Sequence, residues 1–163
     1  MQDLKITYLP IEQLIPYENN ARTHSEQQIK QIVKSIKQFN FTNPILIDEE
    51  GYIIAGHGRL EAALQLKLTS VPTIMLTGLS AAQRKAYVIA DNKLALNAGW
   101  DFEMLAAEID GLNDLGFDLD LLGFSQDELN DLIGNPNSWL GDDDLKSEDE
   151  SSQDLCQSCK RKL

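Results

Sequence analysis

The stretch IIAGHGRLEAALQL, residues 53–66, constrains the fold most, because its pattern changes from strand-like to helix-like within a few residues. The unbroken apolar run at its start predicts a buried strand, and Leu60 to Leu66 predicts a short helix. Gly56 and Gly58 have no side chain, so the bend between the strand and the helix is free of side-chain bulk at these positions. A strand that turns directly into a helix indicates a domain that mixes α and β structure.

The rest of the chain adds elements on both sides of this bend. Ser25 predicts a helix N-terminus with Gln28 as its capping-box partner, and Ser80 predicts another. Pro72 indicates an edge strand or the start of a strand. Strands are predicted within residues 4–15, 44–56 (a hairpin across 48–51) and 70–78, and helices after Ser25, after Ser80, and over 101–112 and 125–134.

Composition and charge bound the class of protein. The 163 residues are 42% hydrophobic and 25% charged, as in a soluble domain with a core. No apolar run is long enough to cross a bilayer, and the first ten residues do not resemble a secretory signal. Cys156 and Cys159 lie near the end, so we expect no disulfide framework in the core. We therefore predict a cytoplasmic protein with no membrane association.

The acidic charge is concentrated in the second part of the chain. Residues 1–100 have ten basic and nine acidic side chains, whereas residues 101–163 have four basic and seventeen acidic ones. We predict three segments: a domain over 1–100, an acidic helical extension over 101–134 and a disordered acidic tail over 135–163. The acidic region would repel phosphates, which disfavours duplex DNA binding through it.

The bend at residues 56–59 has two interpretations. Backbone N–H groups at a glycine-rich helix start can bind a phosphate, and Arg59 can add bidentate hydrogen bonds. His57 can donate a hydrogen bond or transfer a proton near neutral pH. Alternatively, the glycines permit a tight bend and both side chains lie in solvent. Spacing alone leaves both interpretations open.

Residues 5–100 resemble the N-terminal domain of the ParB family, which shares its fold with sulfiredoxin. The resemblance is carried by an ordered series: the arginine loop NNARTHS, SI late in the next helix, NPILI, and AGHGRLEAA followed by VP. It implies an α+β fold, a compact mixed sheet with packed helices. The family turn reads Gly-Glu-Arg-Arg and binds nucleotide phosphates; here Gly56 and Arg59 match, while His57 and Gly58 differ. Sulfiredoxins have their cysteine where this chain has His57, so we expect no reductase activity.

Two further positions match the family pattern. Asp91 and Asn92 in ADNKLAL correspond to an acidic-Asn pair that contacts metal and nucleotide, and Arg22 corresponds to an arginine facing the nucleotide. Alternatively, Asp91 and Asn92 only cap or interrupt a helix, and Arg22 is an exposed residue of a loop. The resemblance thus implies a nucleoside triphosphate, ATP or CTP, with Mg²⁺. Its phosphates would lie at Arg22, Gly56, His57, Gly58, Arg59 and Asn92, the metal at Asp91 and Asn92, and catalysis would use His57 and Asp91.

The second part resembles phage and prophage DNA methyltransferases that carry a ParB-like domain, through ADNKLALNAGWDFEMLAAEI and GFDLDLLGFSQDEL. Methyltransferase catalytic and cofactor motifs are absent, and we expect no helix-turn-helix after Trp100. We predict a nucleotide-binding protein accessory to phage or mobile-element DNA modification or maintenance, with a DNA-modification enzyme or another protein as partner. A metal-dependent nuclease, a small-molecule kinase and an acidic interaction module remain alternatives, as does a zinc half-site at Cys156 and Cys159.

Overall fold

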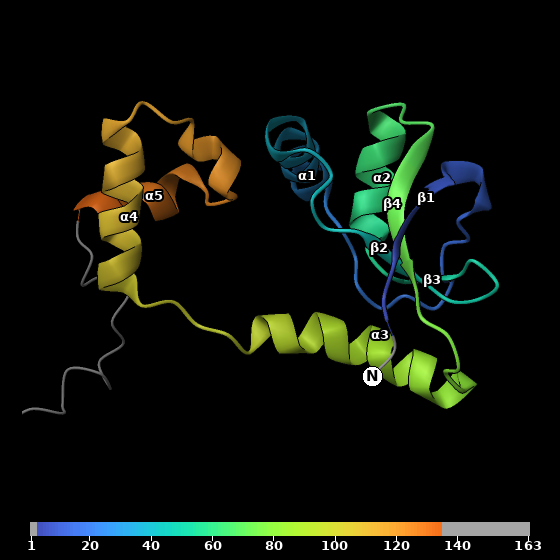
Figure 1. The fold of residues 1–163 in the computed structure, drawn as a ribbon. Coiled ribbons are helices and arrows are strands. Elements are labelled where there is room, and N and C mark those ends of the chain that lie inside the picture. The colour runs from blue at the N-terminus through green and yellow to red at the C-terminus, as the bar shows by residue number, and fades with distance from the viewer. Residues whose placement is uncertain (1–2, 135–163) are drawn as a thin grey trace, which may run out of the picture. The chain divides into compact units, whose positions relative to one another are not determined.

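The structure is a computed structural model that describes residues 3–134 (Figure 1). These residues divide into two compact units, one of residues 3–99 with 120–123 and the other of residues 100–119 with 124–134. The predicted tail and both cysteines lie outside the described residues. In the described part, no helix is both long and apolar enough to cross a membrane.

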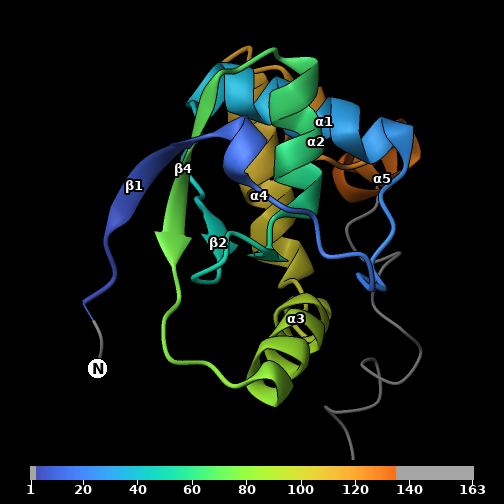
Figure 2. The same ribbon diagram turned by 90° about the vertical axis from the view of Figure 1, so that its right-hand side faces the viewer.

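The first unit is built on a four-stranded sheet whose order is β1-β4-β2-β3. The strands are β1 (Ile6–Pro10), β2 (Ile45–Ile47), β3 (Ile53–Ala55) and β4 (Ser70–Met75). The β2–β4 pair is parallel, and the β1–β4 and β2–β3 pairs are antiparallel. Figure 2 shows β1 and β4 side by side along one edge. The sheet is therefore mixed, as the sequence predicts.

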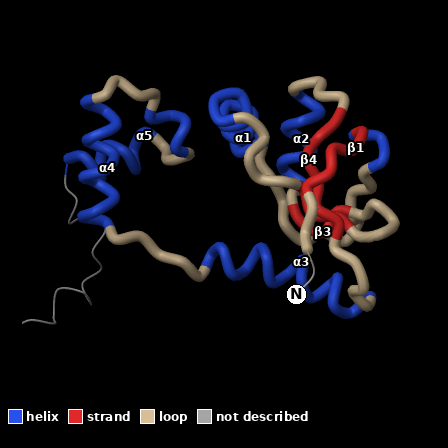
Figure 3. The backbone as a smooth tube through the Cα atoms, in the orientation of Figure 1, coloured by secondary structure: helices blue, strands red, loops and turns tan. Residues whose placement is uncertain are grey.

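The remaining elements of this unit are η1 (Ile11–Gln13), α1 (Glu26–Phe39), α2 (His57–Gln65), α3 (Ala81–Leu96) and most of the 3₁₀ turn η2 (Leu119–Leu122). α1 packs on α2, α2 contacts β2, and α3 lies against β3 (Figure 3). The core is formed by Ile45, Ile47, Ile53 and Val71, each at most 1% exposed, with Leu60 of α2 packed on them. Burying these branched side chains supplies the main driving force for folding.

Side chains cap α1 and α3, as predicted. The Ser25 hydroxyl accepts a hydrogen bond from the Gln28 amide, and the Ser80 hydroxyl accepts one from the Gln83 amide. At Ser80 the Gln83 side chain also bonds back, which completes a capping box. At Ser25 the reciprocal bond is replaced, because the Gln28 side chain bonds the ring of His24 instead. The predicted capping box at Ser25 is therefore only half formed.

Asp48 organises the predicted hairpin turn between β2 and β3. One carboxylate oxygen accepts hydrogen bonds from the amides of Glu50 and Tyr52, at 3.0 and 2.8 Å. Gly51 has a φ of 89°, in the left-handed region that favours glycine. A Cβ at this position would lie 2.8 Å from the Gln13 carbonyl oxygen. Glycine is thus required here both by conformation and by space.

The prediction of an edge strand at Pro72 is wrong, since β4 lies between β1 and β2. Pro72 pairs with Tyr8 on one side, but the ladder with β2 begins at Thr73. Pro72 therefore precedes the first residue paired with β2, so β4 can be an interior strand although proline has no N–H. The alternative that Pro72 marks a strand start is wrong as well, since β4 begins at Ser70; Pro72 precedes only the ladder with β2.

The second unit contains α4 (Phe102–Asp114) and α5 (Gln126–Gly134); the 3₁₀ turn η2 (Leu119–Leu122) precedes α5. α4 and α5 pack together, and Ile109, Leu129 and Leu132 are buried. Asp101 caps α4 by accepting from the Met104 amide, and Ser125 caps α5 by accepting from the Glu128 amide. Both helices fall within the ranges that the sequence predicts, to within two residues.

Gly51→Ala should destabilise the first unit by about 1–3 kcal/mol, because alanine must adopt a positive φ and meets the Gln13 carbonyl. Urea unfolding followed by circular dichroism measures the change. Gly99→Ala is the matched control, since a Cβ there meets nothing within 4 Å, and it should change stability by less than about 0.5 kcal/mol. Equal stability of the two variants would contradict this account of the turn.

Candidate functional site

α2 starts with an open N-terminus directly after β3. It begins at His57, three residues before the predicted start, and Gly56 precedes it with a φ of 106°. No side chain caps this end, whereas Ser25, Ser80, Asp101 and Ser125 cap the other described α-helices. The first intrahelical bond runs from the Leu60 amide to the Gly56 carbonyl, so the amides before Leu60 have no helical partner. Such an end attracts anions.

Arg59 is fixed in the first turn of α2. Its Nη1 donates hydrogen bonds to the carbonyl oxygens of Asn43 and Pro44, at 2.7 and 2.6 Å. A Cβ on Gly56 would lie 3.1 Å from the guanidinium, so this group lies against the bare Cα of Gly56. Burial lowers the pKa of Arg59, and nearby Asp91 partly offsets this effect. Arginine stays charged in proteins. Its Nε and Nη2 donors therefore belong to a positive charge whose position is fixed.

His57 is held as a hydrogen-bond acceptor. Its Nε2 accepts from the Tyr17 backbone amide at 3.2 Å, which requires an unprotonated Nε2. Burial lowers the pKa of His57 below 6.5, His24 lowers it further, and Glu61 opposes them. The imidazole is therefore neutral at pH 7 with its proton on Nδ1. Any proton transfer by His57 would have to use Nδ1, and the other nitrogen positions the loop at Tyr17.

Gly58 provides space for a second histidine. A Cβ at this position would lie 3.1 Å from both His24 Cε1 and Ile32 Cδ1. The His24 ring also bonds the Gln28 side chain through Nδ1, at 3.0 Å. The structure thus gives Gly58 a packing reason in addition to the exposed backbone that the sequence suggests.

Arg22 and Asn92 join the loop before α1 to α3. Arg22 Nη1 donates to the Asn92 carbonyl oxygen at 3.4 Å, and the Asn20 side chain bonds the Arg22 backbone in both directions. The Asn92 side-chain nitrogen donates to the Val88 carbonyl oxygen at 2.8 Å, leaving its Oδ1 as an acceptor. Asp91 is exposed, next to Asn92 within α3. Asp91 and Asn92 lie inside the continuous helix α3, so they neither cap nor interrupt it.

These groups line one cavity of about 320 Å³, which we call the α2 pocket. It brings together all the residues that the sequence singles out: Arg22, Gly56, His57, Gly58, Arg59, Asp91 and Asn92. It also contains Asn20, His24 and Asn43, which sequence analysis missed. Their positions in the sequence could have indicated them: Asn20 and His24 lie two residues on either side of Arg22, and Asn43 is the first residue of NPILI.

The α2 pocket has few ligands for a metal. Among the described residues, no three His, Cys, Asp or Glu side chains gather as a metal site would require. The Asp91 carboxylate and Asn92 Oδ1 provide oxygen donors of the type that Mg²⁺ prefers. This set fits a Mg²⁺ that takes its remaining ligands from phosphates and water, and it does not fit an all-protein cage.

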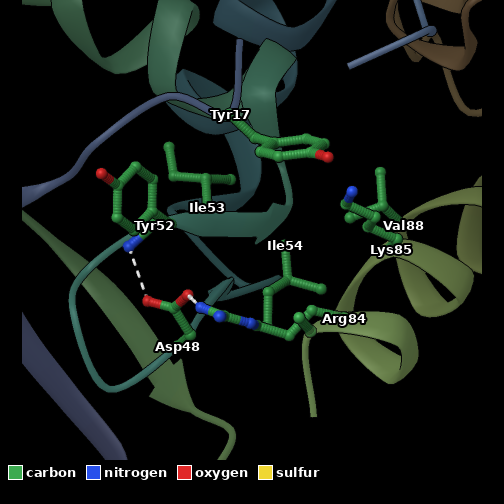
Figure 4. A pocket seen from close by; sticks show the side chains of 9 residues that line it. Tyr17, Asp48, Tyr52, Ile53, Ile54, Arg84, Lys85 and Val88 are labelled. Atoms are coloured by element: carbon green, nitrogen blue, oxygen red, sulfur yellow. Dashed lines mark hydrogen bonds and ion pairs between the residues drawn. The ribbon is translucent and has the colours of Figure 1, made fainter. Parts of the chain in front are cut away.

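Two further hollows lie along α3. The first, of about 740 Å³, lies between residues 17–23 and one face of α3, and we call it the α3 groove. The second, the Asp48 cavity of about 210 Å³, is shown in Figure 4 between Tyr17, Ile54 and Arg84. Arg84 of α3 forms an ion pair with the buried Asp48 and bonds Glu50 at 3.0 Å. Sequence analysis identified neither hollow.

The sheet, the packed helices and the α2 pocket define a ParB-like α+β domain, and comparison with known proteins agrees. Residues 1–92 match the model of the ParB N-terminal domain, and residues 103–155 match that of the ParB-methyltransferase HTH domain. The chain belongs to the ParB N-terminal domain family.

The relatives include a short protein and two longer ones. The ParB-like nuclease domain-containing protein YnaK of Escherichia coli K12 is 58% identical over 84 residues, 52% of this chain and 97% of YnaK. The probable chromosome-partitioning protein ParB of Rickettsia bellii is 31% identical over 53% of this chain and 30% of its own length. The C-terminally truncated ParB of Caulobacter crescentus, crystallised with CTP-γ-S, matches at a TM-score of 0.58 and 23% identity, over 80% of this chain and 71% of that chain.

These comparisons confirm the predicted fold and correct one expectation. The Caulobacter ParB structure supports the fold alone, at 23% identity. We expected no helix-turn-helix after Trp100, but residues 103–155 match a helix-turn-helix model. The expectation was wrong because it relied on charge and on the small number of predicted helices: this range has sixteen acidic residues and one basic residue. Charge opposes phosphate binding, but it does not decide how helices pack.

His57 should titrate below the ordinary histidine pKa of 6.5, because burial disfavours its charged form. A ¹H–¹³C NMR titration measures this, and His24→Gln assigns the signals because the chain has two histidines. The lowered pKa stabilises the fold fully above pH 6.5, and this contribution is lost as pH falls through the folded pKa. A His57 midpoint at or above 6.5 would contradict the assignment.

Proposed function

We propose that the α2 pocket binds a nucleoside triphosphate, with its phosphates at the start of α2. The observation that carries the proposal is the uncapped α2 N-terminus beside the held guanidinium of Arg59. Free amides, a helix dipole and a fixed cation at one point are what a phosphate requires. The other helix starts in the described chain are satisfied by side chains, so this end is distinguished by being left open to a ligand.

We assign ligand-binding roles to the remaining residues of the pocket from their contacts. Arg22 and Asn92 lie at the α3 side, where they would contact the outer phosphates. Asp91 and Asn92 Oδ1 would hold Mg²⁺, which supplies charge neutralisation when it is bound. His57 positions the loop at Tyr17 through Nε2. Asp91 is the carboxylate in the pocket that could orient a water for hydrolysis.

CTP is the first nucleotide to test, and ATP the second. The reason is that the Caulobacter ParB was crystallised with CTP-γ-S. The α2 pocket is also lined by Asn43, which has no role in the proposed phosphate or metal contacts. Its side-chain amide can both donate and accept hydrogen bonds, so it suits the edge of a nucleobase.

We further propose that the protein is accessory to DNA modification on a phage or other mobile element. The support is the match of residues 103–155 to the ParB-methyltransferase HTH domain. The expected partner is a DNA-modification enzyme. A methyltransferase encoded on the same mobile element should change its methyl-transfer rate when the protein and nucleotide are added together. An unchanged rate would contradict this partner and leave nucleotide binding unaffected.

The nuclease alternative has less support, although YnaK carries that name. Nuclease sites usually gather several carboxylates around one or two metals. Asp91 is the one carboxylate among the residues that line the α2 pocket. Incubation with supercoiled plasmid and Mg²⁺ or Mn²⁺, comparing Asp91→Ala with the parent protein, distinguishes a nuclease from a nucleotide-binding protein.

Isothermal titration with CTP or ATP and Mg²⁺ should show saturable binding, and Arg22→Gln should weaken it about tenfold or more. The variant loses one charge-assisted contact to phosphate. Lys30→Gln is the matched control, since it removes one positive charge from α1 outside the pocket. No binding of CTP, ATP or GTP to the parent protein would overturn the proposal, and so would equal weakening by both substitutions.

A further inference from the structure

The α3 groove combines residues shared with the α2 pocket and others that the proposed nucleotide site does not use. Six of its residues follow helical spacing on α3: Lys85, Val88, Ile89, Asn92, Lys93 and Leu96. Positions separated by three, four, seven, eight and eleven residues lie on one face of a helix. This face is opposed by residues 17–23, so the groove has two walls from distant parts of the chain.

The charge of the groove is opposite to that of the chain. Arg22, Lys85 and Lys93 line it, and no acidic residue does. Among the described residues, no carboxylate forms an ion pair with Lys85 or Lys93. The chain as a whole has a net charge of −12. A positive groove in such a chain selects for an anionic ligand.

The floor of the groove is apolar and open to solvent. Ile89 and Leu96 are each 66% exposed, and the Tyr17 ring forms the end of the groove toward the Asp48 cavity. Figure 4 shows Lys85 and Val88 on α3 facing the space beside Tyr17. A ligand that covers this surface must present flat apolar faces together with negative charge. Unpaired nucleobases on a phosphate backbone have both, whereas a duplex hides its base faces.

We propose that the α3 groove binds single-stranded nucleic acid. The phosphates follow Arg22, Lys85 and Lys93, a base stacks on Tyr17, and the side-chain amide of Asn19 reaches a base edge. Lys85 and Lys93 are about 12 Å apart along α3, so the groove follows more than one nucleotide. The proposal does not rest on nucleotide binding, because Tyr17, Lys85 and Lys93 lie outside the α2 pocket.

Fluorescence anisotropy of the full chain with labelled oligothymidylate of about 12 nucleotides tests the proposal. Affinity should fall steeply between about 50 and 200 mM NaCl. The double variant Lys85→Gln, Lys93→Gln should bind more weakly and lower the slope of log affinity against log salt by about 1.4. Tyr17→Leu should weaken binding about 5- to 150-fold with an unchanged salt slope, because it removes stacking and not charge.

The control Lys30→Gln, Lys37→Gln removes the same charge from α1, outside the groove. Its affinity and slope should match the parent protein, and thermal unfolding should show that all variants are folded. Equal effects of the two double variants would overturn the proposal, because they would indicate a general charge effect. Absence of binding at low salt, tighter binding of the matching duplex, or equal displacement by a polyglutamate peptide would overturn it as well.

Discussion

The left-handed backbone at Gly56 sets how β3, α2 and the segment before β2 meet. With a φ of 106°, the residue ends β3 and starts α2 without a side-chain cap. Because Gly56 has no Cβ, the Arg59 guanidinium can lie against it and bond the carbonyls of Asn43 and Pro44, directly before β2. A Cβ at residue 56 would lie 3.1 Å from that guanidinium, so the guanidinium would have to shift by a few tenths of an ångström. The open helix start and its fixed cation are therefore two results of one conformation.

A second junction holds α3, which contributes Asp91 and Asn92 to the pocket. Within the described helix only Val88 is buried, so apolar packing fixes α3 weakly. The ion pair between Arg84 and the buried Asp48 adds a specific attachment, and Arg22 bonds α3 near its other end. The Asp48 side chain is only 4% exposed, so loss of Arg84 would leave a buried carboxylate without its cationic partner. Asp48 thus serves the hairpin turn and the docking of α3 at once.

Local signals in the sequence predicted the local structure. Ser25 and Ser80 act through their own backbone neighbours, so their roles could be inferred without a fold. The positive φ of Gly51 is local in the same way, but its close approach to Gln13 is not. The gathering of Arg22, Arg59, Asp91 and Asn92 was inferred from the family resemblance, since the residues are far apart in sequence. The interior place of β4, the packing of His24 on Gly58 and the Asp48–Arg84 pair depend on the order of strands and on side-chain contacts. No periodic pattern in a single sequence indicates strand order or such side-chain contacts.

The hollows around α3 are not independent compartments. Asn20, Arg22 and Asn92 belong to both the α2 pocket and the α3 groove, and Tyr17 belongs to both the α3 groove and the Asp48 cavity. Tyr17 is also tied by its backbone to His57 at the base of α2. The proposed nucleotide and the proposed nucleic acid would therefore contact some of the same residues. Any factor by which one of these ligands changed the affinity of the other would act equally in the reverse direction, so competition or cooperation between them would be a consequence of the shared walls.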